Sequence, residues 1–132
     1  MRYLLDTNIV SAWAGGQSAP LADRLLATPP ADLCISALVQ HELLYGFALK
    51  SGTRAEARTL RLLEVLPILL FGAPEARRSA ILRSQLSRRG TPVGPYDLLI
   101  AATAIENSLT LVTHNIREFR RVQELSAEDW LA

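Results

Sequence analysis

The sequence has little cysteine, lysine or aromatic content, and it lacks a long apolar run. Cys34 is the only cysteine, so no internal disulfide forms and a reducing cytoplasm is the expected location. The apolar stretches are too short to span a bilayer. Asp6 interrupts the N-terminal stretch before it reaches the length of a signal peptide. We therefore expect neither a membrane-spanning nor a secreted protein.

A strong charge of one sign is also missing. Fourteen basic and 13 acidic side chains leave a net charge of +1, so the overall charge does not indicate a nucleic-acid binder. The arginines nevertheless form two clusters: Arg77, Arg78, Arg83, Arg88 and Arg89, then Arg117, Arg120 and Arg121. Clusters of this kind fit a solvated helix surface and a phosphate-binding surface equally well.

The length and composition indicate one globular domain over residues 1–132, with 49% hydrophobic and 20% charged residues. Strands are expected at 2–5, 33–35, 65–71 and 109–113, with a turn or a last strand at 126–131. Helices are expected at 7–13, 20–27, 37–50, from 54 onward, and at 74–89, 95–107 and 116–121. This alternation predicts an α/β fold in three layers, with a mostly parallel sheet of four to five strands between helices.

In such a sheet, ligands bind beyond the carboxyl ends of the strands, so acids at these ends are of interest. Asp6 directly follows the first expected strand, and Thr7 and Asn8 add two more oxygen-bearing side chains. An aspartate in this place is also a common N-cap of the next helix.

Glu42 lies inside the helix 37–50, on the same face as Leu38, Tyr45 and Leu49. We expect this apolar face to be buried. A buried carboxylate must be paired, hydrogen-bonded or bound to a metal, because an isolated buried charge costs several kcal/mol. A buried arginine partner, or a position at the edge of the stripe, would explain Glu42 without a metal.

Asp97 stands in the first turn of an apolar helix that we expect to be buried. The helix dipole favours a negative charge there, which by itself accounts for Asp97. After the strand 109–113, Thr113 and Asn115 again lie beyond a strand end, and Glu118 is a second acid nearby.

Taken together, Asp6, Glu42 and Asp97 are three acids from distant parts of the chain, each placed where it could face a common site. Clustered carboxylates raise one another's pKa unless a cation neutralises them, and hard oxygen ligands suit Mg²⁺ or Mn²⁺. The cysteine and the two histidines are not spaced as a zinc ligand set. The sequence also lacks a phosphate-binding P-loop and a serine nucleophile elbow.

Four sequence blocks resemble, in order, those of PIN-domain ribonucleases of the VapC toxin group. The blocks are Leu5-Asp6-Thr7-Asn8, Ile35-Ser36 with Glu42-Leu43-Leu44-Tyr45-Gly46, Pro95 to Ala102, and Val112 to Phe119; the closing Glu128-Asp129-Trp130 is similar too. Each block alone is a weak signal, whereas four in order over nearly the whole chain are fairly specific.

This resemblance implies a PIN-like fold, Mg²⁺- or Mn²⁺-dependent endoribonuclease activity, and a VapB-type antitoxin that blocks the site. Asp6, Glu42 and Asp97 match the acidic positions of the family and would hold the metal. The fourth acidic position falls on Asn115, a weaker neutral ligand that would instead position a water or a phosphate. Hydrogen bonds to the acids or the phosphate would come from three further side chains: Thr7, Asn8 and Thr113.

Two other functions fit parts of the sequence. A haloacid-dehalogenase-like phosphatase would use Asp6, but it needs a second aspartate where Asn8 stands and a lysine partner that the chain does not offer. The other is a PIN-like fold that serves only in RNA binding or protein interaction. The three acids argue against this function, whereas Asn115 in place of a fourth acid is compatible with it.

The expected helices between 37 and 63 carry more apolar side chains than one side of a small domain needs. A homodimer, or the docked antitoxin, would cover this surface. The residues concerned are Leu43, Leu44, Phe47, Leu60 and Leu63.

Overall fold

The computed structural model describes residues 1–131, in which five short strands form one parallel sheet in the order β3-β2-β1-β4-β5. The strands are β1 (Tyr3–Leu5), β2 (Leu33–Ser36), β3 (Ile68–Leu69), β4 (Thr110–Val112) and β5 (Ala127–Glu128). The predicted α/β fold is confirmed, and the pairings of the described strands are all parallel. The predicted span 1–132 includes Ala132, which lies outside the described residues.

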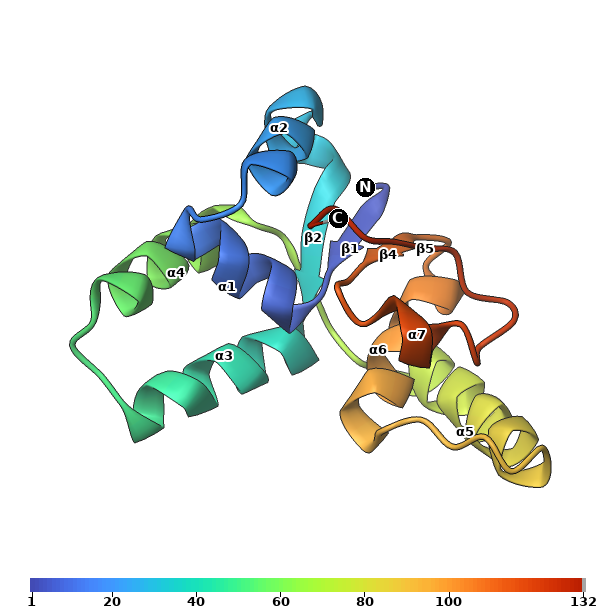
Figure 1. Cartoon of the computed structure of the whole chain (residues 1–132). Coiled ribbons are helices and arrows are strands. Elements are labelled where there is room, and N and C mark those ends of the chain that lie inside the picture. The colour runs from blue at the N-terminus through green and yellow to red at the C-terminus, as the bar shows by residue number, and fades with distance from the viewer. Residues whose placement is uncertain (132) are drawn as a thin grey trace.

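Helices cover the sheet on both sides (Figure 1). In that view α1, α3 and α4 lie on one side of the β1–β2 pair, and α5 and α6 lie on the other. The helices are α1 (Thr7–Gly15), α2 (Ala19–Ala27), α3 (Ala37–Leu49), α4 (Arg54–Val65), α5 (Ala73–Arg88), α6 (Pro95–Glu106) and α7 (Ile116–Phe119). Over residues 1–131, none of these helices combines the length and apolar character needed to cross a membrane.

Local side-chain chemistry sets where several helices begin. The Ser36 hydroxyl accepts a hydrogen bond from the Val39 N–H at 3.1 Å, and Thr53 does the same for the Glu56 N–H at 3.1 Å. These bonds satisfy N–H groups that have no partner inside a helix. Pro20 and Pro95 stand in the first turns of α2 and α6, where a missing N–H costs nothing.

The segment 65–71 is where the expected boundaries were wrong. Helix α4 continues to Val65, and β3 contains only Ile68 and Leu69. Pro67 precedes the strand and accepts, through its carbonyl, a hydrogen bond from the Ile35 N–H at 3.0 Å. The strand lies at the edge of the sheet, as expected for a segment that opens on a residue without an N–H.

The hydrophobic core lies between the central strands and the helices, and α6 is buried along most of its length. Strands β1 and β4 pair in register, so that Leu5 stands opposite Val112. Because parallel strands end at the same edge of the sheet, the residues that follow them, Asp6 and Thr113, are brought side by side. This edge is the one at which the sequence places its candidate acids.

Candidate metal centre

Asp6 is a buried carboxylate at the end of β1, with only 5% of its surface exposed. Its Oδ1 accepts from the Thr7 N–H at 2.9 Å and so caps α1, while its Oδ2 accepts from the Thr113 hydroxyl at 2.8 Å. Burial raises the pKa of Asp6 above its ordinary value, against the lowering effect of these two hydrogen bonds. Asp6 therefore both caps α1 and belongs to the group of candidate acids.

Glu42 does not lie on a buried helix face, which corrects the sequence-based expectation. The buried side of α3 is formed by Val39 and Leu43, whereas Tyr45 is 59% and Leu49 71% exposed. Glu42 is half-buried at the edge, which is one of the alternatives considered above. Its Oε1 is nevertheless buried without a hydrogen-bond partner among residues 1–131. Burial and the negative charge of Asp6 raise the pKa of Glu42, whereas the neighbouring Thr7 side chain and His41 lower it to a smaller extent.

Asp97, in the first turn of α6, has the most strongly perturbed pKa of the three predicted acids. Burial, a hydrogen bond with the Glu118 carboxyl group, and the negative charges of Asp6, Glu118 and Glu42 raise the pKa of Asp97 to about 7. Since two adjacent carboxylates resist losing both protons, the raised pKa of Asp97 and the lowered pKa of Glu118 assign the proton between them to Asp97. These effects place the four acids within electrostatic reach of one another.

Glu118, for which the sequence indicated only a position near Asn115, also belongs to the site. Its Oε1 accepts from the Gly94 N–H at 2.8 Å, and its Oε2 accepts from the Asn115 side-chain amide at 2.7 Å. The backbone hydrogen bond from Gly94 is the largest cause that lowers the pKa of Glu118. The i, i+3 spacing of Asn115 and Glu118 at the start of α7 is the sequence signal that links the two residues.

Asn115 lies beside the acids, and its side-chain amide donates a hydrogen bond to the Glu118 carboxylate. Its backbone N–H donates to the Thr113 hydroxyl at 3.0 Å, so Thr113 connects Asn115 with Asp6. Asn115 thus holds a carboxylate in position at the place where the family resemblance implies a fourth acid.

The remaining predicted residues lie around this group. The Thr7 hydroxyl is buried and without a hydrogen-bond partner within residues 1–131. The Asn8 side chain is exposed and accepts from the His114 N–H at 3.3 Å, so it offers no second carboxylate of the kind a dehalogenase-like phosphatase uses.

The four acids share one edge of the sheet without forming a ready-made coordination shell. In the described part of the chain, no three Asp, Glu, His or Cys side chains are close enough to bind one ion directly as they stand. Mg²⁺ usually keeps several waters and contacts only one or two carboxylates, so wider spacing suits it.

The chemistry of these side chains fits a hard divalent cation. The group offers only oxygen ligands, and Glu42 presents a buried oxygen that nothing in residues 1–131 satisfies. A cation would favour the deprotonated forms of the carboxylates whose pKa values are raised. Both the donor set and the unpartnered oxygen therefore favour Mg²⁺ or Mn²⁺ over a soft metal.

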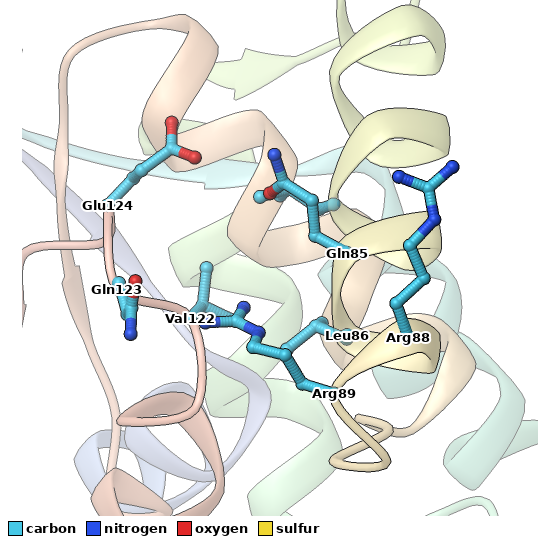
Figure 2. A pocket seen from close by; sticks show the side chains of 8 residues that line it. Gln85, Leu86, Arg88, Arg89, Val122, Gln123 and Glu124 are labelled. Carbon is cyan, nitrogen blue, oxygen red and sulfur yellow. The ribbon is translucent and has the colours of Figure 1, made fainter.

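A hollow of about 370 Å³ lies elsewhere, between the end of α5 and the segment 122–124. Figure 2 shows Arg89 extending across it toward Val122, with Glu124 on the far side and Arg88 pointing away. Nearby, Arg78 pairs with Glu106 at 3.1 Å and with Glu124 at 3.3 Å, so this arginine is engaged in holding the fold. The hollow contains none of the four clustered acids.

Comparison with known proteins identifies relatives over nearly the whole chain. Residues 3–125 match the family model described as the PIN domain. The tRNA(fMet)-specific endonuclease VapC of Shigella flexneri is 36% identical over 134 residues, which cover 98% of both chains. Ribonuclease VapC2 of Rickettsia felis is 35% identical, again over 98% of each chain.

A solved structure agrees with these sequence relatives. A chain in the structure of VapBC2 from Rickettsia felis, bound to a DNA fragment from their promoter, superposes with a TM-score of 0.88. It shares 33% sequence identity, and the match covers 98% of this chain and 99% of that one. The similarity therefore extends over the complete sheet and the helices around it.

Proposed function

This chain belongs to the PIN-domain family as a VapC-type ribonuclease, and from this premise we propose that Asp6, Glu42 and Asp97 hold one Mg²⁺ or Mn²⁺ for RNA hydrolysis. The observation that supports this assignment most strongly is geometric: Asp6 is bonded to Thr113 across the ends of β1 and β4, and Glu42 has a buried Oε1 without a hydrogen-bond partner in residues 1–131. Burial and three neighbouring carboxylates also raise the pKa of Asp97 to about 7. Strongly perturbed acids that share one edge of a sheet are typical of catalytic sites.

Each side chain has a distinct part in this proposal. Asp6 and Asp97 bind the ion, directly or through water, and Thr113 fixes the orientation of Asp6 through their 2.8 Å hydrogen bond. Glu42 uses its unpartnered oxygen to complete the ligand shell or to orient the attacking water. Glu118, held by Gly94 and Asn115, accepts a hydrogen bond from protonated Asp97 and so orients its carboxyl group until the proton is lost to solvent.

When bound, a divalent ion stabilises negative charge on phosphoryl oxygens and lowers the pKa of water. The protein supplies the fixed donors around it. Thr7 and Asn8 lie at the same edge and are proposed to contact the acids or the phosphate. Asn115 acts as a positioning residue through Glu118, which gives the neutral side chain a role without a second metal.

The same premise assigns a protein partner, a VapB-type antitoxin, and makes this chain the toxin of the pair. Leu44 and Leu60 are 42% and 41% exposed, and Val65 is 74% exposed. Leu43, in contrast, is buried in the monomer, so only part of the apolar surface expected on α3 and α4 is available. We propose that this part is covered by the antitoxin or by a second copy in a cytoplasmic complex.

Replacement of single acids tests the assignment. Asp6→Asn and Asp97→Asn should each abolish RNA cleavage in Mg²⁺ and in Mn²⁺ while the protein stays folded. Glu64→Gln, which changes an exposed acid on α4 away from the cluster, is the matched control and should cleave like the wild type. Undiminished cleavage by a folded Asp6 or Asp97 variant would remove these residues from the site. RNA bound equally well in EDTA and never cut by the wild type would instead support a binding module.

A further inference from the structure

Three exposed aromatic rings lie stacked beside the acids and are not used by the function proposed above. His41 lies between Tyr45 and Tyr96: its ring centroid is 6.5 Å from that of Tyr45 and 5.6 Å from that of Tyr96. The interplanar angles are 11° and 29°, so the His41 ring is nearly parallel to that of Tyr45 and tilted against that of Tyr96. The Tyr96 hydroxyl also lies 3.4 Å from the His41 Nε2. We call His41, Tyr45 and Tyr96 the aromatic stack.

The aromatic stack adjoins the candidate metal centre through the chain itself. His41 directly precedes Glu42 on α3, and Tyr96 directly precedes Asp97 on α6. The stack therefore bridges the two helices that carry two of the three proposed ligands. Figure 1 shows these helices approaching each other near their first turns, below the ends of the central strands.

The exposure of the rings argues against a purely structural role. Tyr45 is 59% and Tyr96 46% exposed, and His41 is exposed as well. Tyrosines that only fill a core are buried, whereas these leave ring faces and polar edges open to solvent. Outside the stack the whole chain has only two tryptophans, one tyrosine, three phenylalanines and one histidine, so three rings in one exposed place are a concentration of aromatic side chains.

We propose that the aromatic stack binds an unpaired nucleobase of the RNA substrate, beside the phosphate that is cleaved. The proposal rests on the proposed ribonuclease function and extends it to substrate recognition. Single-stranded RNA is commonly bound by bases stacked on aromatic rings, and every base has a face suited to such contact. The phenol and imidazole edges add hydrogen-bonding groups that aliphatic side chains lack.

The position of the stack favours RNA over a protein partner. A protein interface would depend equally on the neighbouring aliphatic side chains of α3, among them Leu44 and Leu49. The aromatic rings instead come from residues next to two of the acids: His41 is close enough to Glu42 to affect its pKa, and Tyr96 directly precedes Asp97. A nucleotide whose phosphate lies at the acids would therefore have its base near Tyr96. A single-stranded substrate thus meets a ring face directly next to the reacting group.

Kinetics of ring-removing variants test this role. Tyr96→Leu and Tyr45→Leu should raise KM for a short single-stranded RNA about tenfold, in the range of one lost base–aromatic stack, with little change in kcat. Tyr96→Phe and Tyr45→Phe retain the ring face and should restore most of the affinity. Leu49→Ala removes exposed apolar surface from the same helix and should leave KM unchanged. A loss of RNA affinity in Leu49→Ala as large as in the tyrosine variants would identify a general apolar surface and overturn the proposal.

A second measurement separates failure of the stack from failure of the proposed function. RNAs with one abasic nucleotide at successive positions should reveal a position at which Tyr96→Leu no longer weakens binding, because no base remains to stack. Binding is measured in the Asp6→Asn background, where no cleavage occurs. In a second RNA, 2-aminopurine replaces the base at the position so identified. Its fluorescence should be quenched by the Asp6→Asn protein and not when Tyr96→Leu is added to that protein. If Tyr96→Leu weakens RNA binding equally at every abasic position, the base-binding role of the aromatic stack is contradicted even if the enzyme cleaves RNA. Persistent quenching without metal-dependent cleavage by the wild type contradicts the proposed function instead.

Discussion

The Thr113 hydroxyl donates to the Asp6 Oδ2 at 2.8 Å, and this bond joins the ends of the adjacent strands β4 and β1. The two residues are 107 positions apart in the chain. Thr113 is fully buried and also accepts from the Asn115 N–H at 3.0 Å. One hydroxyl therefore holds both a proposed metal ligand and the segment that carries Glu118.

Thr113→Val should destabilise the protein and weaken metal binding at the same time. The change keeps the shape of the side chain but leaves the Asp6 carboxylate and the Asn115 N–H without their partner, which costs about 1–3 kcal/mol. Chemical denaturation in EDTA measures the free energy of unfolding, and titration with Mn²⁺ measures the affinity. Thr103→Val is the matched control, since Thr103 is equally buried but its hydroxyl bonds to the Leu99 carbonyl within α6. A Thr113 variant with unchanged Mn²⁺ affinity would show that this bond serves stability alone.

The raised pKa of Asp97 predicts that metal affinity increases as the pH rises toward 7. The ordinary pKa of this carboxyl group is 3.8, and the folded protein raises it to about 7, so a proton must leave before the ion binds. Mg²⁺ affinity measured by calorimetry should therefore be low at pH 5 and should level off above about pH 7. An affinity independent of pH over this range contradicts the assignment of Asp97.

The same shift has the opposite effect on the stability of the metal-free protein. Folded Asp97 binds its proton more tightly than unfolded Asp97, so its contribution to stability is lost as the pH rises from its ordinary pKa toward 7. Asp6 and Glu42 act in the same direction, and Glu118 in the opposite one. Asp97→Asn removes one of the repelling charges and should raise the melting temperature in EDTA at pH 8 by roughly 3 °C. A lower melting temperature would mean that the carboxylate is satisfied without a cation.

Two substitutions at position 115 distinguish a positioning residue from a fourth metal ligand. Asn115→Asp sets a carboxylate where an amide now donates to the Glu118 Oε2 at 2.7 Å, and repulsion should displace Glu118. We expect cleavage near neutral pH to fall about as much as in Asn115→Ala. Cleavage rates over a pH series, measured for both variants, decide the question. Tighter Mn²⁺ binding in Asn115→Asp than in the wild type would show that position 115 contacts the ion.

The order of strands and helices, and the capping position of Asp6, could be predicted because they depend on local patterns. Asp6 follows an apolar strand and caps the helix after it, as that position indicates. Features of this kind are determined by residues that are neighbours in the sequence. The parallel sheet then followed from the alternation of elements, and with it the edge at which the acids gather.

The face of α3 could not be predicted in the same way. This helix is apolar on most sides, so the spacing of Leu38 and Glu42 does not indicate which stripe meets the core. The packed structure buries Val39 and Leu43 instead. Glu42 therefore reaches the site from the edge of the helix, and the residues beyond it on that face remain exposed.

Glu118 escaped the prediction because its position depends on a distant contact. The Gly94 N–H, 24 residues earlier in the chain, holds its carboxylate next to Asp97. No local pattern reveals that contact. The family resemblance in turn directed attention to Asn115, whose side chain proves to be the second partner of Glu118.

Titration with Mn²⁺, monitored by electron paramagnetic resonance, tests most directly the claim that Asp6, Glu42 and Asp97 share one metal ion. The wild type and Glu64→Gln should bind a single Mn²⁺ with the same affinity. Asp6→Asn and Asp97→Asn should lose that binding, and Glu42→Gln should weaken it, with all variants folded as judged by circular dichroism. Mn²⁺ binding of unchanged affinity in the Asp6, Glu42 and Asp97 variants alike would contradict a shared metal centre at this edge of the sheet.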